Sequence, residues 1–113
     1  MPYDQDLADR IRELMCHHED LTESRMFGGL AFSLSGHLAI AASGQGGVLV
    51  RVDPTAMDRL VASSAATPAI MRGREMSGWL RVGAEDLRTK RQLARWVRVG
   101  TERVRSLPPK RGR

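Results

Sequence analysis

Short turns divide the stretch from Arg25 to Val52 into strand-sized segments, and this spacing constrains the fold more than any other feature of the sequence. Ser35-Gly36 is a two-residue hairpin signal, and the glycines within 44–47 mark a second turn. Such connections are far too short for parallel crossovers, so we expect antiparallel pairing. The expected strands cover residues 25–34, with a kink at Gly28-Gly29, then residues 37–42 and 48–52.

Helical spacing predicts three helices around this sheet. Residues 4–18 carry an apolar stripe with acids at its start, and the polar residues 19–24 end this first helix. Asp53-Pro54 begins a short middle helix, because Asp caps helix starts and Pro suits the first position. A loop at 63–68 precedes a strand at 78–82, with a further short strand within 69–76. Glu85 and Asp86 begin a long final helix that runs to about Ser106.

These elements predict an α+β fold with an antiparallel meander sheet of four to five strands. An N-terminal helix, a short middle helix and a long C-terminal helix flank the sheet. The chain has 113 residues, enough for one core, so we expect a single domain over 1–107 and a basic, disordered tail over 108–113. With one cysteine, no disulfide within the chain and no four-cysteine zinc site can form. No signal peptide or membrane span is evident, which favours a cytoplasmic protein without membrane contact.

No residue pattern indicates a catalytic centre, a metal site or a cofactor. In Cys16-His17-His18 the neighbouring side chains of a helix point about 100° apart, so they cannot all meet one ion. The glycine pairs lie between strands rather than before a helix, as a phosphate cradle requires. Five carboxylates have structural explanations, such as caps and helix starts: Asp53, Asp58, Glu75, Glu85 and Asp86. We therefore expect a protein that is not an enzyme.

The C-terminal part of the chain concentrates positive charge. From Arg88 onward there are ten basic residues and one acid, whereas residues 1–87 hold eight basic residues and twelve acids. On the final helix, basic residues recur at steps of three and four and form what we call the arginine stripe: Arg88, Arg91, Arg95, Arg98 and Arg105. The basic tail adds Lys110, Arg111 and Arg113. Arginine favours bidentate contact with phosphates or carboxylates, so these residues are candidates for binding nucleic acid or a partner. Glu102 fills the remaining slot and can pair with Arg98 and Arg105.

A family resemblance follows from motifs in a fixed order. They are Met26-Phe27-Gly28-Gly29-x-x-Phe32, Leu49-x-Arg51-x-Asp53, Met76-Ser77-Gly78-Trp79-Leu80-x-Val82 and Leu93-x-x-Trp96-Val97. Together they resemble the N-terminal domain of the TfoX/Sxy family. The resemblance implies an antiparallel sheet flanked by helices, and a regulatory role, since full-length relatives are bacterial regulators of natural competence that act with a cyclic-AMP receptor protein. Those relatives carry a second, C-terminal domain. The present sequence ends at Arg113, so we expect the N-terminal domain in a stand-alone form. The matched residues are mainly structural, although Arg51, on a mostly apolar strand, needs a partner.

Three functions stay open on the sequence alone. The first is a non-enzymatic regulatory or adaptor domain that acts through an unknown protein partner and is linked to transcription or competence. The second is a nucleic-acid-binding accessory protein that uses the arginine stripe. The third is a small ligand-binding domain or enzyme with a pocket between sheet and helices. Sheet edges can pair, which also leaves a homodimer open.

Overall fold

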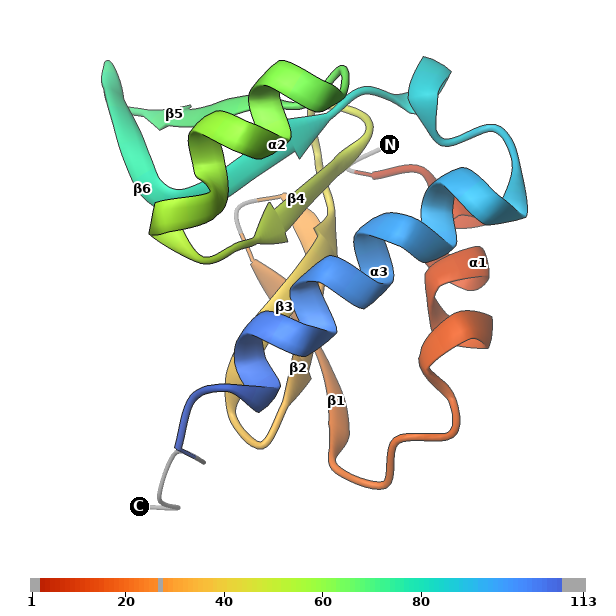
Figure 1. Cartoon of the computed structure of the whole chain (residues 1–113). Helices are drawn as coiled ribbons and strands as arrows, with labels where there is room; N and C mark the ends of the chain where they lie inside the picture. The colour runs from red at the N-terminus through yellow and green to blue at the C-terminus, as the bar shows by residue number, and fades with distance from the viewer. Residues whose placement is uncertain (1–2, 27, 109–113) are drawn as a thin grey trace.

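The computed structural model describes residues 3–26 and 28–108 of the chain. Within these residues the chain forms three α-helices, two short 3-10 helices and six strands (Figure 1). The first helix, α1, covers Gln5–Met15. Asp4 caps it, because its side chain accepts a hydrogen bond from the Leu7 backbone N–H. The predicted N-terminal helix is thus confirmed, although it ends at Met15 rather than near residue 18.

The segment that follows α1 forms a hairpin. Strand β1 (Leu21–Met26) pairs with β2 (Gly29–Leu34) along its whole length. The prediction of one kinked strand over 25–34 is therefore wrong, because the chain reverses at the glycine pair. The prediction that residues 19–24 only end the first helix is wrong as well. Five of the six residues of β1 are exposed at the sheet edge, so the strand lacks the alternation of a half-buried one.

The next two strands follow the predicted turns. Strand β3 (His37–Ala42) returns from the turn at 35–36 and pairs with β2, and β4 (Val48–Arg51) pairs with β3 after the glycine turn. Asp53 then caps the 3-10 helix η1 (Pro54–Ala56) by accepting a hydrogen bond from the Thr55 N–H at 2.9 Å. Helix α2 (Met57–Ser63) continues directly from η1, which confirms the predicted middle helix.

The sheet is larger than predicted and is not a simple meander. Strands β5 (Thr67–Met71) and β6 (Arg74–Val82) form a second hairpin, and β5 starts inside the predicted loop at 63–68. The order across the sheet is β1-β2-β3-β4-β6-β5, with antiparallel pairing throughout. The α+β class with three flanking helices is confirmed, with six strands in place of four to five.

The predicted long final helix is divided into two pieces. Glu85 and Asp86 belong to a 3-10 helix, η2 (Ala84–Asp86), and the long helix α3 begins only at Lys90 and ends at Arg105. Thr89 and Gln92 explain this start, since each side chain binds the backbone N–H of the other in a capping box. Acids at a helix start fit both η2 and a longer helix, so their position alone does not distinguish the two.

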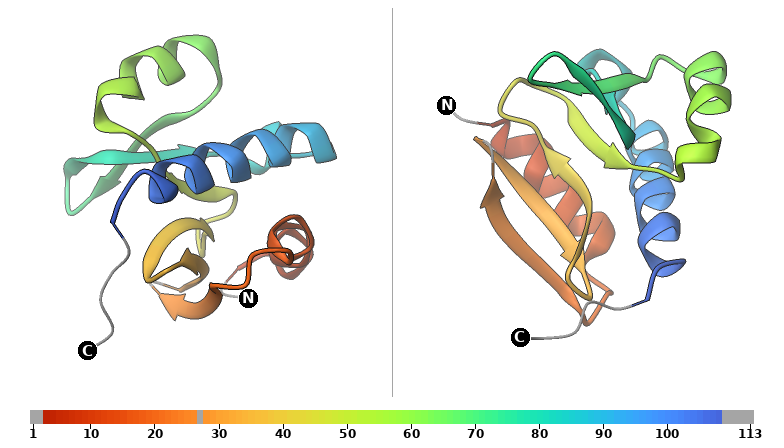
Figure 2. Two further views of the ribbon diagram at one scale, coloured as in Figure 1. Left: turned by 60° about the horizontal axis from the view of Figure 1, so that its bottom comes forward. Right: turned by 90° about the vertical axis from the view of Figure 1, so that its left-hand side faces the viewer.

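The three helices lie on one face of the sheet (Figure 2). Helix α3 crosses β3 so closely that a Cβ on Gly100 would lie 2.4 Å from the Ala39 carbonyl oxygen. The buried core between helices and sheet is mainly aliphatic, with Phe32 and Trp96 as its aromatic members. Helix α1 packs beside one flank of α3, and α2 rests on β5 and β6 beyond the other flank. The two flanks of α3 are therefore the surfaces on which the predicted arginines can be assessed.

Candidate functional site

The arginine stripe is shorter in the structure than in the prediction. Arg88 lies before the start of α3 and is not part of the helix, which corrects its placement on the stripe. Arg91, Arg95 and Arg98 are exposed on α3 and form a row one and two turns apart. We call these three residues the α3 arginines. Lys110, Arg111 and Arg113 of the predicted tail fall outside the described residues.

Arg105 is held by another part of the chain. Its guanidinium donates to both carboxylate oxygens of Asp20, at 2.6 and 2.8 Å, and lies 3.1 Å from Nδ1 of His18. Hydrogen bonds from Arg105, and one from Ser35, hold the pKa of Asp20 well below its usual value. The expected pairing of Glu102 with Arg105 is wrong, because Asp20 takes that place, and within the described residues Glu102 pairs with no arginine. Arg105 thus joins the end of α3 to the segment after α1.

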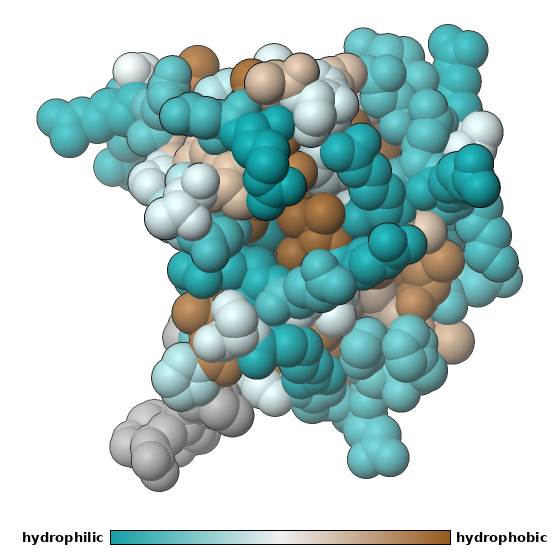
Figure 3. All heavy atoms as spheres, in the orientation of Figure 1, coloured by the Kyte–Doolittle hydropathy of each residue, from teal (hydrophilic) through white to brown (hydrophobic). Residues whose placement is uncertain are grey.

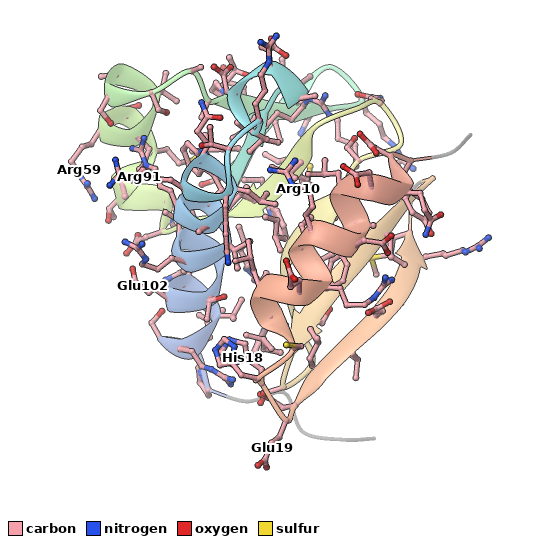
Figure 4. All side chains as sticks on the ribbon, turned by 90° about the vertical axis from the view of Figure 1, so that its right-hand side faces the viewer. Arg10, His18, Glu19, Arg59, Arg91 and Glu102 are labelled. Atoms are coloured by element: carbon pink, nitrogen blue, oxygen red, sulfur yellow. The ribbon has the colours of Figure 1, made fainter. Side chains whose placement is uncertain are left out.

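Arg10 makes a similar link at the other end of α3. Its Nη2 donates to the Leu87 carbonyl oxygen at 2.7 Å, with the carbonyls of Arg88 and Thr89 at 3.4 Å. Figure 4 shows Arg10 between α1 and the start of α3. Nothing in the sequence near Arg10 indicates this role, since its acceptors are backbone oxygens some 77 residues away.

A cleft opens on the opposite flank of α3, between this helix and α2. It has a volume of about 330 Å³ and is lined by η1, α2 and the C-terminal half of α3. Figure 3 shows a hollow there, with apolar atoms at its floor and hydrophilic side chains around it. The lining consists of Val52, Asp53, Ala56, Arg59, Leu60, Val99, Glu102, Arg103 and Ser106. We call it the α2–α3 cleft. It joins apolar and charged groups in one concave surface beside the α3 arginines.

Charges of both signs surround this cleft. Figure 4 shows Arg59 from α2 with Arg91 and Glu102 from α3 on one side of the molecule. Arg103 is half-buried, and its Nε is excluded from solvent without a hydrogen-bond partner among the described residues. Asp53 already accepts hydrogen bonds from the backbone and hydroxyl of Thr55, which lower the pKa of Asp53, as does the charge of Arg103.

The residues of the motif lie in different surroundings. Phe32 and Trp96 are buried, whereas Met26 is 42% exposed and Phe27 falls outside the described residues. Gly29 allows β2 to approach β3, because a Cβ there would lie 2.3 Å from the Ala42 carbonyl oxygen. Gly28 occupies the turn between β1 and β2 and makes no contact that a Cβ would disturb.

Arg51 has the partner that its position on an apolar strand requires. Its guanidinium carbon lies 5.3 Å from the centroid of the Trp79 ring, on the neighbouring strand β6. Desolvation by burial lowers the pKa of Arg51, and the positive charge of Arg103 lowers it further. A similar contact places Arg95 4.9 Å from the Trp96 ring, so this arginine is partly fixed against its own helix.

The residues Cys16, His17 and His18 make local contacts at the end of α1. His17 and His18 stack with ring centroids 4.1 Å apart, and Cys16 is exposed with Sγ 3.3 Å from the Glu13 carbonyl oxygen. No group of three His, Cys, Asp or Glu side chains suited to a metal occurs in the described part of the chain. No helix among residues 3–26 and 28–108 has the length and apolar character needed to cross a membrane.

Sequence comparison adds one finding to this geometry. The family model of the TfoX N-terminal domain matches residues 13–103, which span β1 to β6 and most of α3. No curated protein and no solved structure matches the chain. The matched range includes the α3 arginines and almost all of the α2–α3 cleft.

Proposed function

The chain belongs to the TfoX N-terminal domain family, and we propose that it is a non-enzymatic regulatory domain that acts by contacting another protein. The observation that carries this proposal is the α2–α3 cleft, whose apolar floor lies directly beside exposed arginines. Protein interfaces combine an apolar centre with a polar rim, and arginine is enriched in them. The floor is supplied by Val52, Leu60 and Val99, Arg59 and Arg103 line the cleft, and the α3 arginines precede its lining residues on the same helix.

Nucleic acid is the second candidate, and one observation favours it. The α3 arginines are exposed in one row and form no ion pair within the described residues, so they could contact successive phosphates. Two features weigh against this role. Arg105 and Arg88 do not extend the row of exposed arginines. A phosphate backbone is also polar, so it would leave the apolar floor of the cleft uncovered. Binding to nucleic acid would rest on few charges and fall steeply with salt.

The experiment is a capture assay with matched charge reversals. The immobilised chain recovers a protein from bacterial extract, and that protein is then purified and titrated against the wild type and two double variants. Arg91→Glu with Arg95→Glu reverses the charge beside the cleft. Arg72→Glu with Arg74→Glu makes the same change of charge at the exposed β5–β6 turn, remote in sequence from the cleft lining. We expect at least a tenfold loss of affinity in the first variant and little change in the second.

Two results would contradict the proposal. One is equal affinity of both variants for the purified partner, with circular dichroism showing that both are folded. The other is binding of labelled duplex or single-stranded DNA, or of RNA, in fluorescence anisotropy at physiological salt, lost in Arg91→Glu with Arg95→Glu. That second result would move the assignment to the nucleic-acid candidate.

A further inference from the structure

Arg103 is the least satisfied charged side chain of the α2–α3 cleft. It lies on α3 one turn after Val99, and its Nε is excluded from solvent without an acceptor in the described part of the chain. The ion pairs among residues 3–26 and 28–108 involve Arg12 and Arg105, not Arg103. The half-buried guanidinium lines the cleft, so a carboxylate in the cleft would give this side chain an acceptor, although Nε itself is closed off from the cleft.

The surroundings of Arg103 favour an anion of single charge. Arg59 lines the same cleft, and Arg51 lies close enough for the charge of Arg103 to lower its pKa, after the larger effect of desolvation. These arginines attract an anion. Asp53 and Glu102 also line the cleft, and their carboxylates oppose a group of double negative charge such as phosphate. A carboxylate carries one charge, and its planar shape matches the guanidinium.

The remaining lining describes what the anion is attached to. Val99 and Ala56 present aliphatic surface next to the two arginines, with the almost fully buried Val52 and Leu60 beneath them. These aliphatic residues can cover a short aliphatic chain, and the other five lining residues carry the polar and charged groups. The cleft volume, about 330 Å³, is at the small end of ligand pockets. It fits one or two amino-acid side chains.

We propose that the α2–α3 cleft binds an acidic-aliphatic peptide segment of the partner protein, with a glutamate or aspartate carboxylate on Arg103 and Arg59. Neighbouring leucine- or valine-like side chains of the segment lie on Val99 and Ala56, above the buried Val52 and Leu60. The partner's peptide thus supplies the ion-pair partner that the Arg103 guanidinium lacks within the described residues. This inference rests on the proposed function, because it names the chemistry of the partner at the same site. It assigns the anchoring role to Arg103, which is not part of the arginine stripe.

The test is an NMR titration of the whole ¹⁵N-labelled chain with two blocked peptides. Acetyl-Leu-Glu-Leu-amide carries the proposed chemistry, and acetyl-Leu-Gln-Leu-amide differs only in its neutral side chain. We expect saturable shifts confined to amides of residues 52–60 and 99–106 with the glutamate peptide, and at least tenfold weaker binding of the glutamine peptide. Equal responses, shifts elsewhere or no saturable binding would overturn the inference. Inorganic phosphate that binds more tightly than the glutamate peptide would also overturn it.

Variants distinguish specific binding of the carboxylate by Arg103 from a general effect of the positive charge of the chain. Arg103→Gln removes the charge and is expected to weaken the glutamate peptide at least tenfold, while Arg25→Gln, on the exposed strand β1, makes the same change outside the cleft and leaves binding unchanged. Arg103→Lys keeps the charge but replaces the planar guanidinium with an ammonium group, so it should give an intermediate loss of affinity. This variant provides the test if Arg103→Gln does not fold. Equal peptide affinity in wild type and Arg103→Lys would contradict bidentate anchoring by Arg103.

The two proposals fail in different ways. If the peptide does not bind but Arg91→Glu with Arg95→Glu still loses the purified partner, only the carboxylate site is wrong. If the glutamate peptide binds in the cleft but the partner complex tolerates both double variants, the peptide site stands and the proposed contact surface is wrong.

Discussion

On the flank of α3 that faces α1, arginine side chains are bound to oxygens of the protein itself, whereas on the flank that faces α2 they are not. Arg10 donates to the Leu87 carbonyl, and Arg105 forms a bidentate pair with Asp20. Across the helix, Arg59 and Arg103 line an open cleft and form no ion pair in the described chain. The same residue type therefore fixes the fold on one flank and has no ion-pair partner among the described residues on the other.

This difference shows why charge counting alone misjudges a basic helix. An arginine whose donors are already bound contributes little to recognition, because a partner would have to displace the existing acceptor. An arginine beside an apolar floor can exchange water for a partner's carboxylate at lower cost. The predictions below test this contrast between the two flanks, in order of decreasing effect.

The largest effect is expected from Gly100→Val, which would push α3 away from β3 and so disturb the packing on both flanks of the helix. Gly100 lies where α3 crosses β3, and a Cβ there would overlap the Ala39 carbonyl oxygen, which is backbone and cannot move aside. We expect the free energy of unfolding to fall by about 3 kcal/mol, at the upper end of the range for overpacking. Urea unfolding measures it.

Thr101→Val is the matched control for this substitution. It introduces the same side chain at the next position of α3, where the Thr101 hydroxyl is buried without a hydrogen-bond partner among the described residues. Removing that hydroxyl should change stability by less than about 1 kcal/mol, in the stabilising direction. Similar destabilisation in both variants would mean that α3 is not in close contact with β3.

A smaller effect is expected from Arg10→Ala on the α1 flank. This change leaves the carbonyl of Leu87 without its charged donor and removes a link between α1 and the start of α3. The expected loss is about 2 kcal/mol, typical of a hydrogen bond to a charged group. The matched change on the exposed row, Arg91→Ala, should alter stability by less than about 0.5 kcal/mol. Thermal or urea unfolding that gives equal losses would remove the distinction between the flanks.

The smallest effect is expected from Asp20→Asn, and it depends on pH. The pKa of Asp20 is lower in the folded chain than its unfolded value of about 3.9. Below pH 4 the unfolded chain binds the proton first, so the stability provided by Asp20 is present above that pH and is lost as the pH falls toward the folded pKa. Asp20 and Arg105 are partly exposed, so the variant should lose about 1 kcal/mol at neutral pH.

The measurement for Asp20 is the melting temperature between pH 2 and pH 7. The wild type should lose stability more steeply than Asp20→Asn below pH 4. Both proteins should also lose some stability in acid through protonation of Glu23, whose pKa is lowered chiefly by its hydrogen bonds from Arg12. Parallel curves would show that the bond to Arg105 does not persist in solution.

The fold could be predicted where local signals and tertiary packing agree. β3 and β4 combine buried positions with tight turns, and both appear within one residue of the expected bounds. β1 could not be predicted, because it is an edge strand with exposed polar residues, and its sequence therefore lacks the alternation of apolar and polar residues that indicates a half-buried strand. The break before α3 depends on the Thr89 capping box, which competes with the acids at 85–86 as a helix start.

The candidate site was harder to predict, because it depends on how two helices are spaced. The exposure of the α3 arginines follows from their periodicity on one helix. The cleft does not, since α2 packs on β5 and β6 whereas α3 packs chiefly on β3 and β4. One signal was present: Arg103 lies one turn from Val99 and next to the buried Val104, away from the arginine row, so a cation borders the apolar face. That position predicts a half-buried arginine but not its missing acceptor.

The two links on the α1 flank also determine when the domain can be completed during synthesis. The Arg10 contact spans 77 residues and the Arg105 contact spans 85, whereas the hairpins β1–β2 and β2–β3 close over a few residues. Local hairpins can form as soon as they leave the ribosome, but contacts of long sequence separation wait for the last helix. Until Arg105 emerges, the apolar face of the sheet lacks its main cover. The nascent chain therefore passes through an interval in which that face is open to chaperones or to other chains.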